Sequence, residues 1–325
     1  MTAALLNVDR LSVTFAGTRG ERLVALDGVS FDLRPGEMLG MVGESGAGKS
    51  VTGAVIAGLL DASATVSAED LRLGDQSLLG LSPHDWRSVR GRQIATIFQD
   101  PLTALDPLYT VGQHLTETLR THFPMSRTEA RRRAAALLAE TGIPAAESRL
   151  DDYPHEFSGG MRQRVVIALA LAGEPRLLVA DEPTTALDVS VQAQIMALLR
   201  RLCRERGLAV LLITHDLGVV ADCCDRVAVM YAGRLVELGP VAEVIGRPSH
   251  PYTAGLMAAI PTLDAPPGRL RQIDGAMPRL SEVPAGCAFH PRCPARLPRC
   301  EVERPPSVPV GATDVACWLY PPEVA

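Results

Sequence analysis

The stretch GESGAGKS, from Gly43 to Ser50, has residue types and a spacing suited to binding a polyphosphate. It matches the pattern G-x-x-x-x-G-K-S/T between an apolar run and a helical pattern, which favours a phosphate loop over a glycine-rich turn with a chance lysine. Its glycines let backbone N–H groups curl around phosphate oxygens, and the following helix adds a favourable dipole. Lys49 is expected on the β- and γ-phosphates, and the Ser50 hydroxyl on Mg²⁺. The expected phosphate-binding residues are Gly43, Glu44, Ser45, Gly46, Ala47, Gly48, Lys49, Ser50 and Val51.

A pair of acidic residues supplies the second half of such a site. Asp181 and Glu182 directly follow the apolar run Leu177 to Ala180. A carboxylate at the end of a strand can reach Mg²⁺ through water, which is the role expected of Asp181. Glu182 can orient or deprotonate an attacking water. Two acids after a strand often only begin a helix, but their position downstream of a phosphate loop favours the catalytic interpretation.

The elements that must position these residues are short buried strands separated by helical patterns. Continuous apolarity is typical of parallel strands covered on both faces, and the alternation with helices predicts a doubly wound α/β sheet. Ahead of them, 11–17 and 29–36 alternate between polar and apolar residues, as antiparallel strands with one exposed face do. The expected buried strands are EMLGMV (37–42), RLLVA (176–180), AVLLIT (209–214) and RVAVM (226–230).

The middle of the chain, from about Leu102 to Phe157, is poor in strand patterns. Its segment RTEARRRAAALLAE (127–140) predicts an amphipathic helix. The arginines of that helix could form a basic site, but a solvated helix face is the simpler interpretation.

Composition narrows the class of protein. The chain has 325 residues, enough for one large domain and an accessory piece. A hydrophobic content of 47% argues against a disordered chain, and a net charge of −5 offers no general basic field for nucleic acid. MTAALLNVDR does not read as a signal peptide, and VVIALALA (165–172) is far shorter than the ~18 residues of a membrane span. We therefore expect a cytosolic protein with reduced thiols.

Three further stretches indicate the family. FSGGMRQR (157–164), ITHDLG (213–218) and IFQDPLTALDP (97–107) follow in the expected order, and the sequence resembles the nucleotide-binding subunits of ATP-binding cassette transporters over about residues 5–240. The resemblance implies an α/β phosphate-loop ATPase core with a mostly parallel sheet, an antiparallel β subdomain and a helical subdomain at about 100–160. The expected domains are a cassette at 1–240 and a Pro- and Cys-rich C-terminal extension at 241–325.

The resemblance also implies roles for residues outside the loop. Ser158, Gly159 and Gly160 would meet the γ-phosphate of ATP held by a second subunit, so that each site is completed in trans. Gln99 would sense the γ-phosphate and the transport subunit and join the Mg²⁺ site. His215 would hold the γ-phosphate and the attacking water.

Two further assignments follow from the same resemblance. Asp188 would lie at the seam of the dimer, and Phe15 would stack on adenine, although a core aromatic is a serious rival for Phe15. The signature FSGGM has Phe and Met where the family favours Leu and Gln. Its Ser-Gly-Gly core is intact, so the expected role stands.

QDPLTALDP and SHPYTAGLMAAIP (249–261) resemble the ATPase subunits of dipeptide, oligopeptide and nickel importers. Asp106 stands where such subunits often have Asn. The resemblance implies an ATPase that energises peptide import at the cytoplasmic face of the inner membrane. Nickel or another solute is an alternative cargo, and a soluble non-transport ATPase acting on nucleic acid is the alternative from another class.

The partners that this resemblance implies are a second cassette, expected to differ from this chain, two transmembrane permease subunits and, through them, an extracytoplasmic solute-binding protein. No nucleic acid is expected. The cofactors are ATP with Mg²⁺.

Of the 25 prolines, 13 lie from Pro261 onward, and we expect this part of the extension to be neither strongly helical nor sheet-like. Four of the seven cysteines lie there with the spacing C-x₅-C-x₆-C-x₁₆-C. A metal staple would supply folding energy that a small core cannot. Zinc usually requires a C-x₂₋₄-C pair, whereas a 4Fe–4S cluster has no fixed spacing. The four cysteines are Cys287, Cys293, Cys300 and Cys317.

The resemblance to peptide-importer ATPases implies a 4Fe–4S cluster, structural rather than redox, at these four cysteines. Zinc and simple buried or free thiols stay open as alternatives. His290 could be a further ligand but is more simply a loop histidine. Cys203, Cys223 and Cys224 are expected to be packed as small apolar residues.

Overall fold

The computed structural model describes residues 3–17, 20–99, 101–185, 187–260 and 272–320. Met1, Thr2, Asp100 and Pro261, which belong to stretches quoted above, lie outside the described residues. The chain divides into two compact units. Unit 1 comprises 1–5, 33–38 and 80–213, and unit 2 comprises 6–32, 39–79 and 214–325.

The sheet of unit 1 has three parallel strands with β8 in the centre: β7 (Ile94–Ile97), β8 (Leu177–Asp181) and β9 (Ala209–Ile213). In its register, Ala180 lies between Ile97 and Leu212. Every residue of β9 is buried, as expected for a strand covered on both faces. The strands predicted at 176–180 and 209–214 are confirmed to within one residue.

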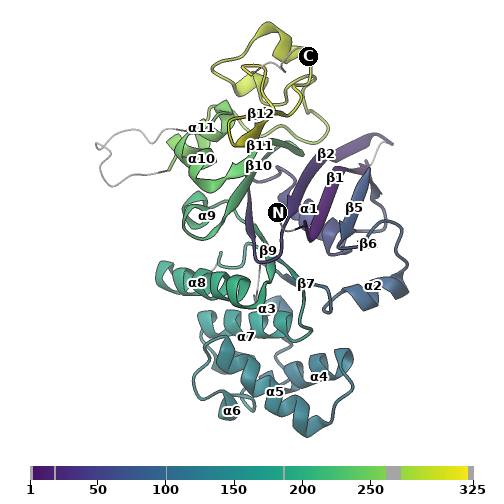
Figure 1. Ribbon diagram of the computed structural model, residues 1–325, viewed down its shortest axis with the longest axis vertical. Helices are drawn as coiled ribbons and strands as arrows, with labels where there is room; N and C mark the ends of the chain where they lie inside the picture. Colours follow the sequence, from purple (N-terminus) through teal and green to yellow (C-terminus); the bar gives the residue numbers. More distant parts are fainter. Residues whose placement is uncertain (1–2, 18–19, 100, 186, 261–271, 321–325) are drawn as a thin grey trace. The chain divides into compact units, whose positions relative to one another are not determined.

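Helices form the rest of unit 1 (Figure 1). Helix α7 contacts β7, and α8 contacts β9. In chain order these helices are α2 (Pro83–Val89), α3 (Pro101–Ala104), α4 (Val111–His122), α5 (Arg127–Glu140), α6 (Ala146–Arg149), the 3-10 helix η1 (Pro154–Glu156), α7 (Gly159–Leu171) and α8 (Val189–Arg206).

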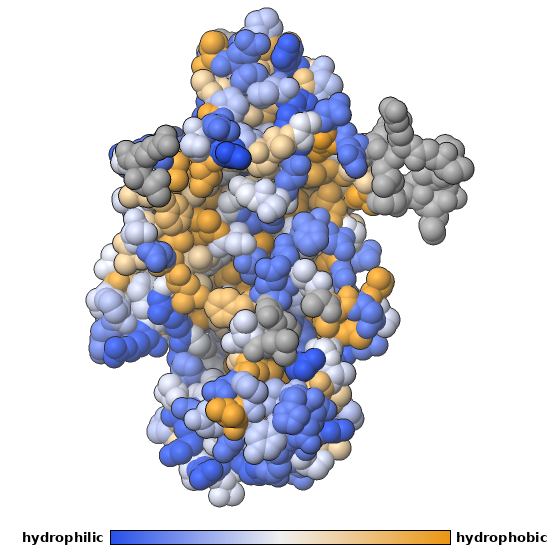
Figure 2. Space-filling model, turned by 180° about the vertical axis from the view of Figure 1, so that it is seen from behind, coloured by the Kyte–Doolittle hydropathy of each residue, from blue (hydrophilic) through white to orange (hydrophobic). Residues whose placement is uncertain are grey.

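The helix predicted at 127–140 is confirmed as α5. Ala130, Ala134 and Leu138 are fully buried on its inner face. Its arginines lie on the outside, where Arg131 pairs with Asp151 at 2.6 Å. The surface around α4, α5 and α6, the part that Figure 1 draws lowest, is mostly hydrophilic (Figure 2). These positions agree with the solvated interpretation of the arginines.

Unit 2 contains an antiparallel β subdomain, as predicted. β1 (Leu6–Ala16) pairs antiparallel with β4 (Thr65–Ser67) and with β5 (Asp70–Leu73). The strand order is β2-β1-β5-β6, with β2 at Arg22–Leu33 and β6 at Gln76–Ser77. Alternate residues of β1 are buried, which is the pattern of a sheet with one exposed face.

The second sheet of unit 2 has the strand order β12-β13-β11-β10-β3. β3 (Met38–Val42) is parallel to β10 (Arg226–Tyr231), and β10 is antiparallel to β11 (Arg234–Pro240). The helices α1 (Lys49–Ile56) and α9 (Leu217–Cys223) follow the phosphate loop and His215 in the chain.

The C-terminal extension has little regular structure, but it does add strands to this sheet. β12 (Val308–Val310) and β13 (Thr313–Val315) form a hairpin, and β13 pairs with β11. Proline has no backbone N–H to donate to a sheet. Because no proline lies in β13, this strand keeps its backbone donors although the tail is rich in proline. The remaining elements are α10 (Val241–Gly246), α11 (Pro251–Ala258), η2 (His290–Arg292) and η3 (Pro298–Glu301).

An aromatic cluster forms the core under the extension. Tyr231, Tyr252 and Phe289 are almost fully buried, and their rings pack at 4.7–5.3 Å between centroids. Such pairs stabilise beyond the area that they bury. In the part of the chain that the structure describes, no helix combines the length and apolarity needed to cross a membrane.

Candidate functional site

The phosphate loop, Gly43–Ser50, lies in unit 2 and joins β3 to the first two residues of α1. Gly43 has φ 152 and Gly48 has φ 104, backbone values that residues other than glycine rarely adopt. A Cβ on Gly43 would collide with the carbonyl oxygen of Met230, and one on Gly48 would lie 2.7 Å from Leu26 Cδ2. Glycine is therefore required at both positions by backbone conformation and by close packing.

Lys49 is buried and folds back over the loop. Its Nζ donates hydrogen bonds to the carbonyl oxygens of Gly43 at 2.8 Å and Glu44 at 3.0 Å. Ala47 is buried, whereas Ser45, Gly46 and Ser50 are exposed and Val51 is half-buried. The loop thus presents exposed polar groups at the start of α1, the arrangement that binds anions at helix N-termini.

Two residues of the extension that the sequence did not single out contact Glu44. The Glu44 N–H donates to the Tyr252 hydroxyl at 2.9 Å. Arg292 donates to both carboxylate oxygens of Glu44, at 2.7 and 3.0 Å. Local sequence patterns contain no signal for these contacts, because 208 and 248 positions separate the partners.

Unit 1 brings Gln99 and Glu182 together. Glu182 follows the last residue of β8, Asp181, and has φ 48. Its N–H donates to the carbonyl oxygen of Ile213 at 2.8 Å, so the left-handed backbone is held by the neighbouring strand. Gln99 Nε2 donates to Glu182 Oε2 at 3.1 Å. The carboxylate is thereby oriented beside the end of the strand.

Thr185 is a further neighbour of Glu182 that the sequence interpretation missed. Its Oγ1 donates to Glu182 Oε2 at 2.9 Å and lies 3.2 Å from the Glu182 carbonyl oxygen. A hydroxyl three residues after the acid is a recurrent local hydrogen-bonding pattern, so this contact could have been suspected.

Ser158, Gly159 and Gly160 form the start of α7 in unit 1. Ser158 is the N-cap, and its Oγ accepts a hydrogen bond from the Met161 N–H at 3.3 Å. A Cβ on Gly160 would lie 2.5 Å from Val191 Cγ1, so α7 and α8 approach closely there. Ser158 is exposed, which leaves the helix N-terminus open to an anion.

Asp188 is the N-cap of α8. One of its carboxylate oxygens accepts from the N–H groups of Ser190 and Val191, each at 3.0 Å, and from the Ser190 hydroxyl at 2.7 Å. These hydrogen bonds, led by that of the Ser190 side chain, lower the pKa of Asp188. The residue therefore has a structural role within this chain, beside its expected place at a dimer seam.

His215 and Phe15 both lie in unit 2. His215 is exposed two positions after the end of β9. Phe15 is half-buried near the end of β1, so it is not a fully packed core aromatic. Its stacking on adenine stays a prediction.

The four clustered cysteines are close enough to influence one another electrostatically. Burial is the main cause that raises the pKa of Cys287 to about 11, and the thiols of Cys300, Cys317 and Cys293 contribute to the rise. Burial also raises the pKa of Cys293 and of Cys317. In the part of the chain that the structure describes, no disulfide links any of the cysteines.

The expected metal staple is not preformed by the described residues. Within them, no three His, Cys, Asp or Glu side chains have an arrangement that could hold a metal ion. Burial disfavours the thiolate forms of Cys287, Cys293 and Cys317, the forms that bind metals. His290 Nδ1 lies 2.9 Å from the Cys287 carbonyl oxygen, which places it in a local turn. Cys203, Cys223 and Cys224 are buried as expected.

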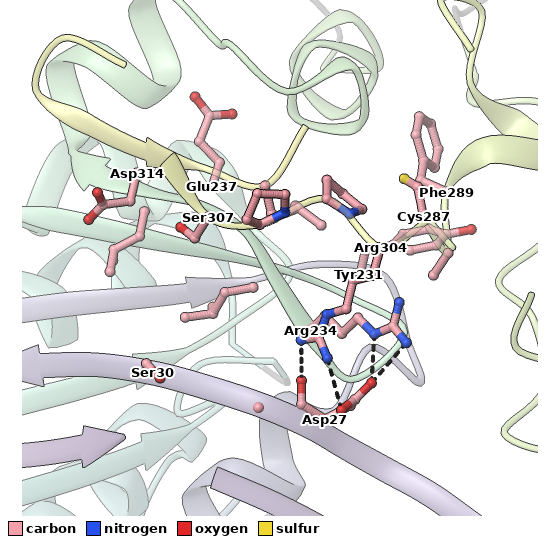
Figure 3. Close-up of a pocket in the computed structure, with 18 of the residues that line it drawn as sticks. Asp27, Ser30, Tyr231, Arg234, Glu237, Cys287, Phe289, Arg304, Ser307 and Asp314 are labelled. Carbon is pink, nitrogen blue, oxygen red and sulfur yellow. Dashed lines mark hydrogen bonds and ion pairs between the residues drawn. The ribbon is translucent and has the colours of Figure 1, made fainter. Parts of the chain in front are cut away.

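A cavity of about 780 Å³ separates part of the extension from β2 and β11 (Figure 3). Asp27 lies at one wall, where it pairs with Arg234 at 2.8 Å and with Arg304 at 3.0 Å. Arg234 also donates to the Gly286 carbonyl oxygen at 2.9 Å. These contacts fasten the extension to β2 without involving the phosphate loop.

Two parts of the chain match known protein families. Residues 26–185 match the family model described as ABC transporter. Residues 236–300 match the model described as oligopeptide/dipeptide transporter, C-terminal region.

Curated relatives match nearly the whole chain. It is 48% identical over 317 residues to the dipeptide transport ATP-binding protein DppD of Bacillus subtilis, which covers 97% of this chain and 94% of that one. It is 46% identical over 302 residues to the Escherichia coli protein of the same name, with 93% and 92% covered. A dimeric, post-hydrolysis ATP-binding cassette, MJ0796, bound to ADP and Pi, is similar in structure, with a TM-score of 0.65 and 28% identity over 73% of this chain and 98% of that one.

Proposed function

The chain belongs to the ATP-binding cassette family, in its oligopeptide and dipeptide transporter branch, and is an ATPase that energises peptide import; from that premise we propose how its residues divide the work. Lys49 and the backbone N–H groups of the phosphate loop hold the β- and γ-phosphates of ATP. Ser50, Asp181 and Gln99 bind Mg²⁺, directly or through water. The bound Mg²⁺ neutralises charge on the transferred phosphoryl group.

Glu182 is the general base in this proposal. The observation that carries it is the pair of hydrogen bonds that orient its carboxylate, from Gln99 at 3.1 Å and from Thr185 at 2.9 Å. A base must lie within hydrogen-bond reach of the water whose proton it takes, and an oriented carboxylate meets that requirement better than a mobile one. His215 then holds the γ-phosphate and the attacking water.

The second half of each site comes from a partner cassette. In this proposal, Ser158, Gly159 and Gly160 at the start of α7 bind the γ-phosphate of ATP held by the partner, while Asp188 lies at the seam and Phe15 stacks on adenine. The exposed N-terminus of α7 supports this role. The partner is a different cassette, so the working dimer is a heterodimer.

ATP-binding cassettes of importers work as dimers on transmembrane permease subunits, and we place this chain peripherally at the cytoplasmic face of the membrane. A solute-binding protein outside delivers the peptide. The test is purification of the tagged chain with its permeases, followed by reconstitution in vesicles. We expect peptide and binding protein to stimulate ATP hydrolysis. Stimulation by DNA or RNA instead, without copurifying membrane subunits, would support a non-transport ATPase and overturn the proposal.

We further propose that the four clustered cysteines bind a 4Fe–4S cluster with a structural role. The chemistry of the donor set supports it, since thiolates are the ligands of such clusters and all four thiols belong to one segment. Ligation by iron would stabilise the thiolate forms of Cys287, Cys293 and Cys317, which burial disfavours.

The cluster is tested on anaerobically purified protein by iron, zinc and acid-labile sulfide content and by the visible spectrum. We expect about four irons and four sulfides per chain. Cys300→Ser should lose them, whereas Cys203→Ser, a buried cysteine of α8, should keep them. One zinc without sulfide, or no metal, would contradict the cluster.

A further inference from the structure

Arg292 links the cysteine-bearing part of the extension to the phosphate loop. It is the last residue of η2, between Cys287 and Cys293. Its guanidinium makes a two-pronged ion pair with Glu44, and only 6% of the Arg292 side chain is exposed. Paired N–H donors fix the orientation of a carboxylate as well as its distance. The second residue of the phosphate loop is therefore held by a residue 248 positions away.

Each polar group of Glu44 is engaged. Its N–H donates to Tyr252, its carbonyl oxygen accepts from Lys49, and its carboxylate accepts from Arg292. Lys49 is the residue expected on the phosphates, so the position of Glu44 determines where the lysine is anchored. A shift of Glu44 would move a hydrogen-bond acceptor of Lys49 directly.

Arg292 is itself rigidly placed. Its Nε donates to the Asp274 carbonyl oxygen at 2.9 Å, and its guanidinium lies 5.7 Å from the Tyr231 ring and 5.9 Å from the Phe289 ring. An arginine side chain stays charged at physiological pH, so the ion pair with Glu44 persists. Lysine has no planar fork and could not make the same set of contacts.

Attachment of the extension does not depend on Arg292. Strand β13 pairs with β11, and Glu237 accepts the N–H groups of Ser249 and His250 at 2.9 and 3.0 Å. Arg304 and Arg234 hold Asp27 (Figure 3). The Arg292–Glu44 ion pair is therefore not needed for attachment. Because it contacts the phosphate loop, it indicates a role in shaping the loop.

We propose that Arg292 is a positioning residue for the nucleotide site, through which the cysteine segment, Cys287–Cys300, sets the affinity of the phosphate loop for Mg·ATP. This inference rests on the proposed nucleotide role of the loop. It makes the extension part of the nucleotide site, because any displacement of η2 would move Arg292 and, through the ion pair, Glu44.

The test compares Arg292→Gln with Arg304→Gln, a matched loss of another arginine that anchors the extension. For Arg292→Gln we expect the Kd for Mg·ATP and the KM to rise about tenfold, which corresponds to about 1.4 kcal/mol, while kcat stays within about twofold. Arg304→Gln should leave both unchanged. Glu44→Gln should reproduce the effect, and the double variant should be no worse than either single one, because all three lose the same pair.

Equal affinities of Arg292→Gln and Arg304→Gln, in proteins with matching far-UV spectra and Tm values, would overturn the inference. If Arg292→Gln does not fold, Glu44→Gln and Arg292→Lys carry the test, and wild-type affinity in both would overturn it equally. Lys49→Ala distinguishes a failure of the inference about Arg292 from a failure of the proposed nucleotide role of the loop. Wild-type affinity in Lys49→Ala removes the nucleotide role of the loop, whereas lost affinity there with no effect of Arg292→Gln removes only the inference.

Discussion

The phosphate loop and the cysteine segment are both short, irregular stretches of unit 2, yet their conformations have different origins. The loop depends on glycines at fixed positions and on a lysine that bonds to carbonyls five and six residues away. The cysteine segment depends on partners far along the chain, of which Arg292 and Glu44 are the clearest pair. Local chemistry is visible in a sequence, whereas distant partners become visible only in the fold.

Replacing Gly48 tests whether the phosphate loop depends on its own glycines, and this change should have the largest effect. With φ 104 and Leu26 Cδ2 only 2.7 Å from a new Cβ, Gly48→Ala should lower the free energy of unfolding by about 1–3 kcal/mol. The displaced loop should also lose about tenfold or more in ATP affinity, measured by calorimetric titration, a loss of about 1.4 kcal/mol.

Gly207→Ala is its matched control. Gly207 also has a positive φ, 65, but nothing within 4 Å would meet a new Cβ. We expect a loss of about 1–2 kcal/mol in stability and unchanged ATP affinity. Equal affinities in the two alanine variants would show that the loop does not need the glycine conformation.

Acid should destabilise the folded C-terminal extension by protonating His250. This histidine is 1% exposed, and its Nδ1 accepts from the Tyr252 N–H at 3.0 Å, which only the neutral ring can do. Burial lowers its pKa to about 3. Because the unfolded chain binds this proton near pH 6.5, stability is complete above that pH and falls as the pH drops toward 3.

Between pH 6.5 and 5 the expected loss is about 1.6 kcal/mol, measured by urea unfolding. His250→Asn keeps an acceptor for the helix cap but does not titrate, so its stability should fall less over this interval. His84→Asn, at an exposed position, should behave as the unchanged protein does. Identical pH slopes for all three proteins would rule out His250 as the source.

The smallest effect is expected at the arginines of α5, which belong to neither region. Arg131→Gln removes an ion pair with Asp151 whose side chains are 47% and 69% exposed. Solvent and salt screen such pairs, so the free energy of unfolding should change by less than about 0.5 kcal/mol. ATP turnover should not change, and a clear loss of turnover would show that this face has a function beyond solvation.

The sequence allowed the strands, the phosphate loop and the acidic pair to be predicted because each depends on neighbouring residues. Asp188 was interpreted through resemblance alone, although an Asp directly before a helix is itself a capping signal. The β12–β13 hairpin was missed, since its strands are short and lie among prolines. Tyr252 and Arg292 could not have been predicted, because their contacts with Glu44 exist only once the chain has folded.

The central assignment is that of Glu182 as the base of the ATPase. The most direct test is a single-turnover measurement on Glu182→Gln assembled with its partner cassette, with ATP binding measured on the same sample. We expect ATP affinity close to that of the unchanged protein and hydrolysis slower by a factor on the order of 10² or more. Hydrolysis at a near-normal rate with intact binding would contradict the assignment and place the base at another residue.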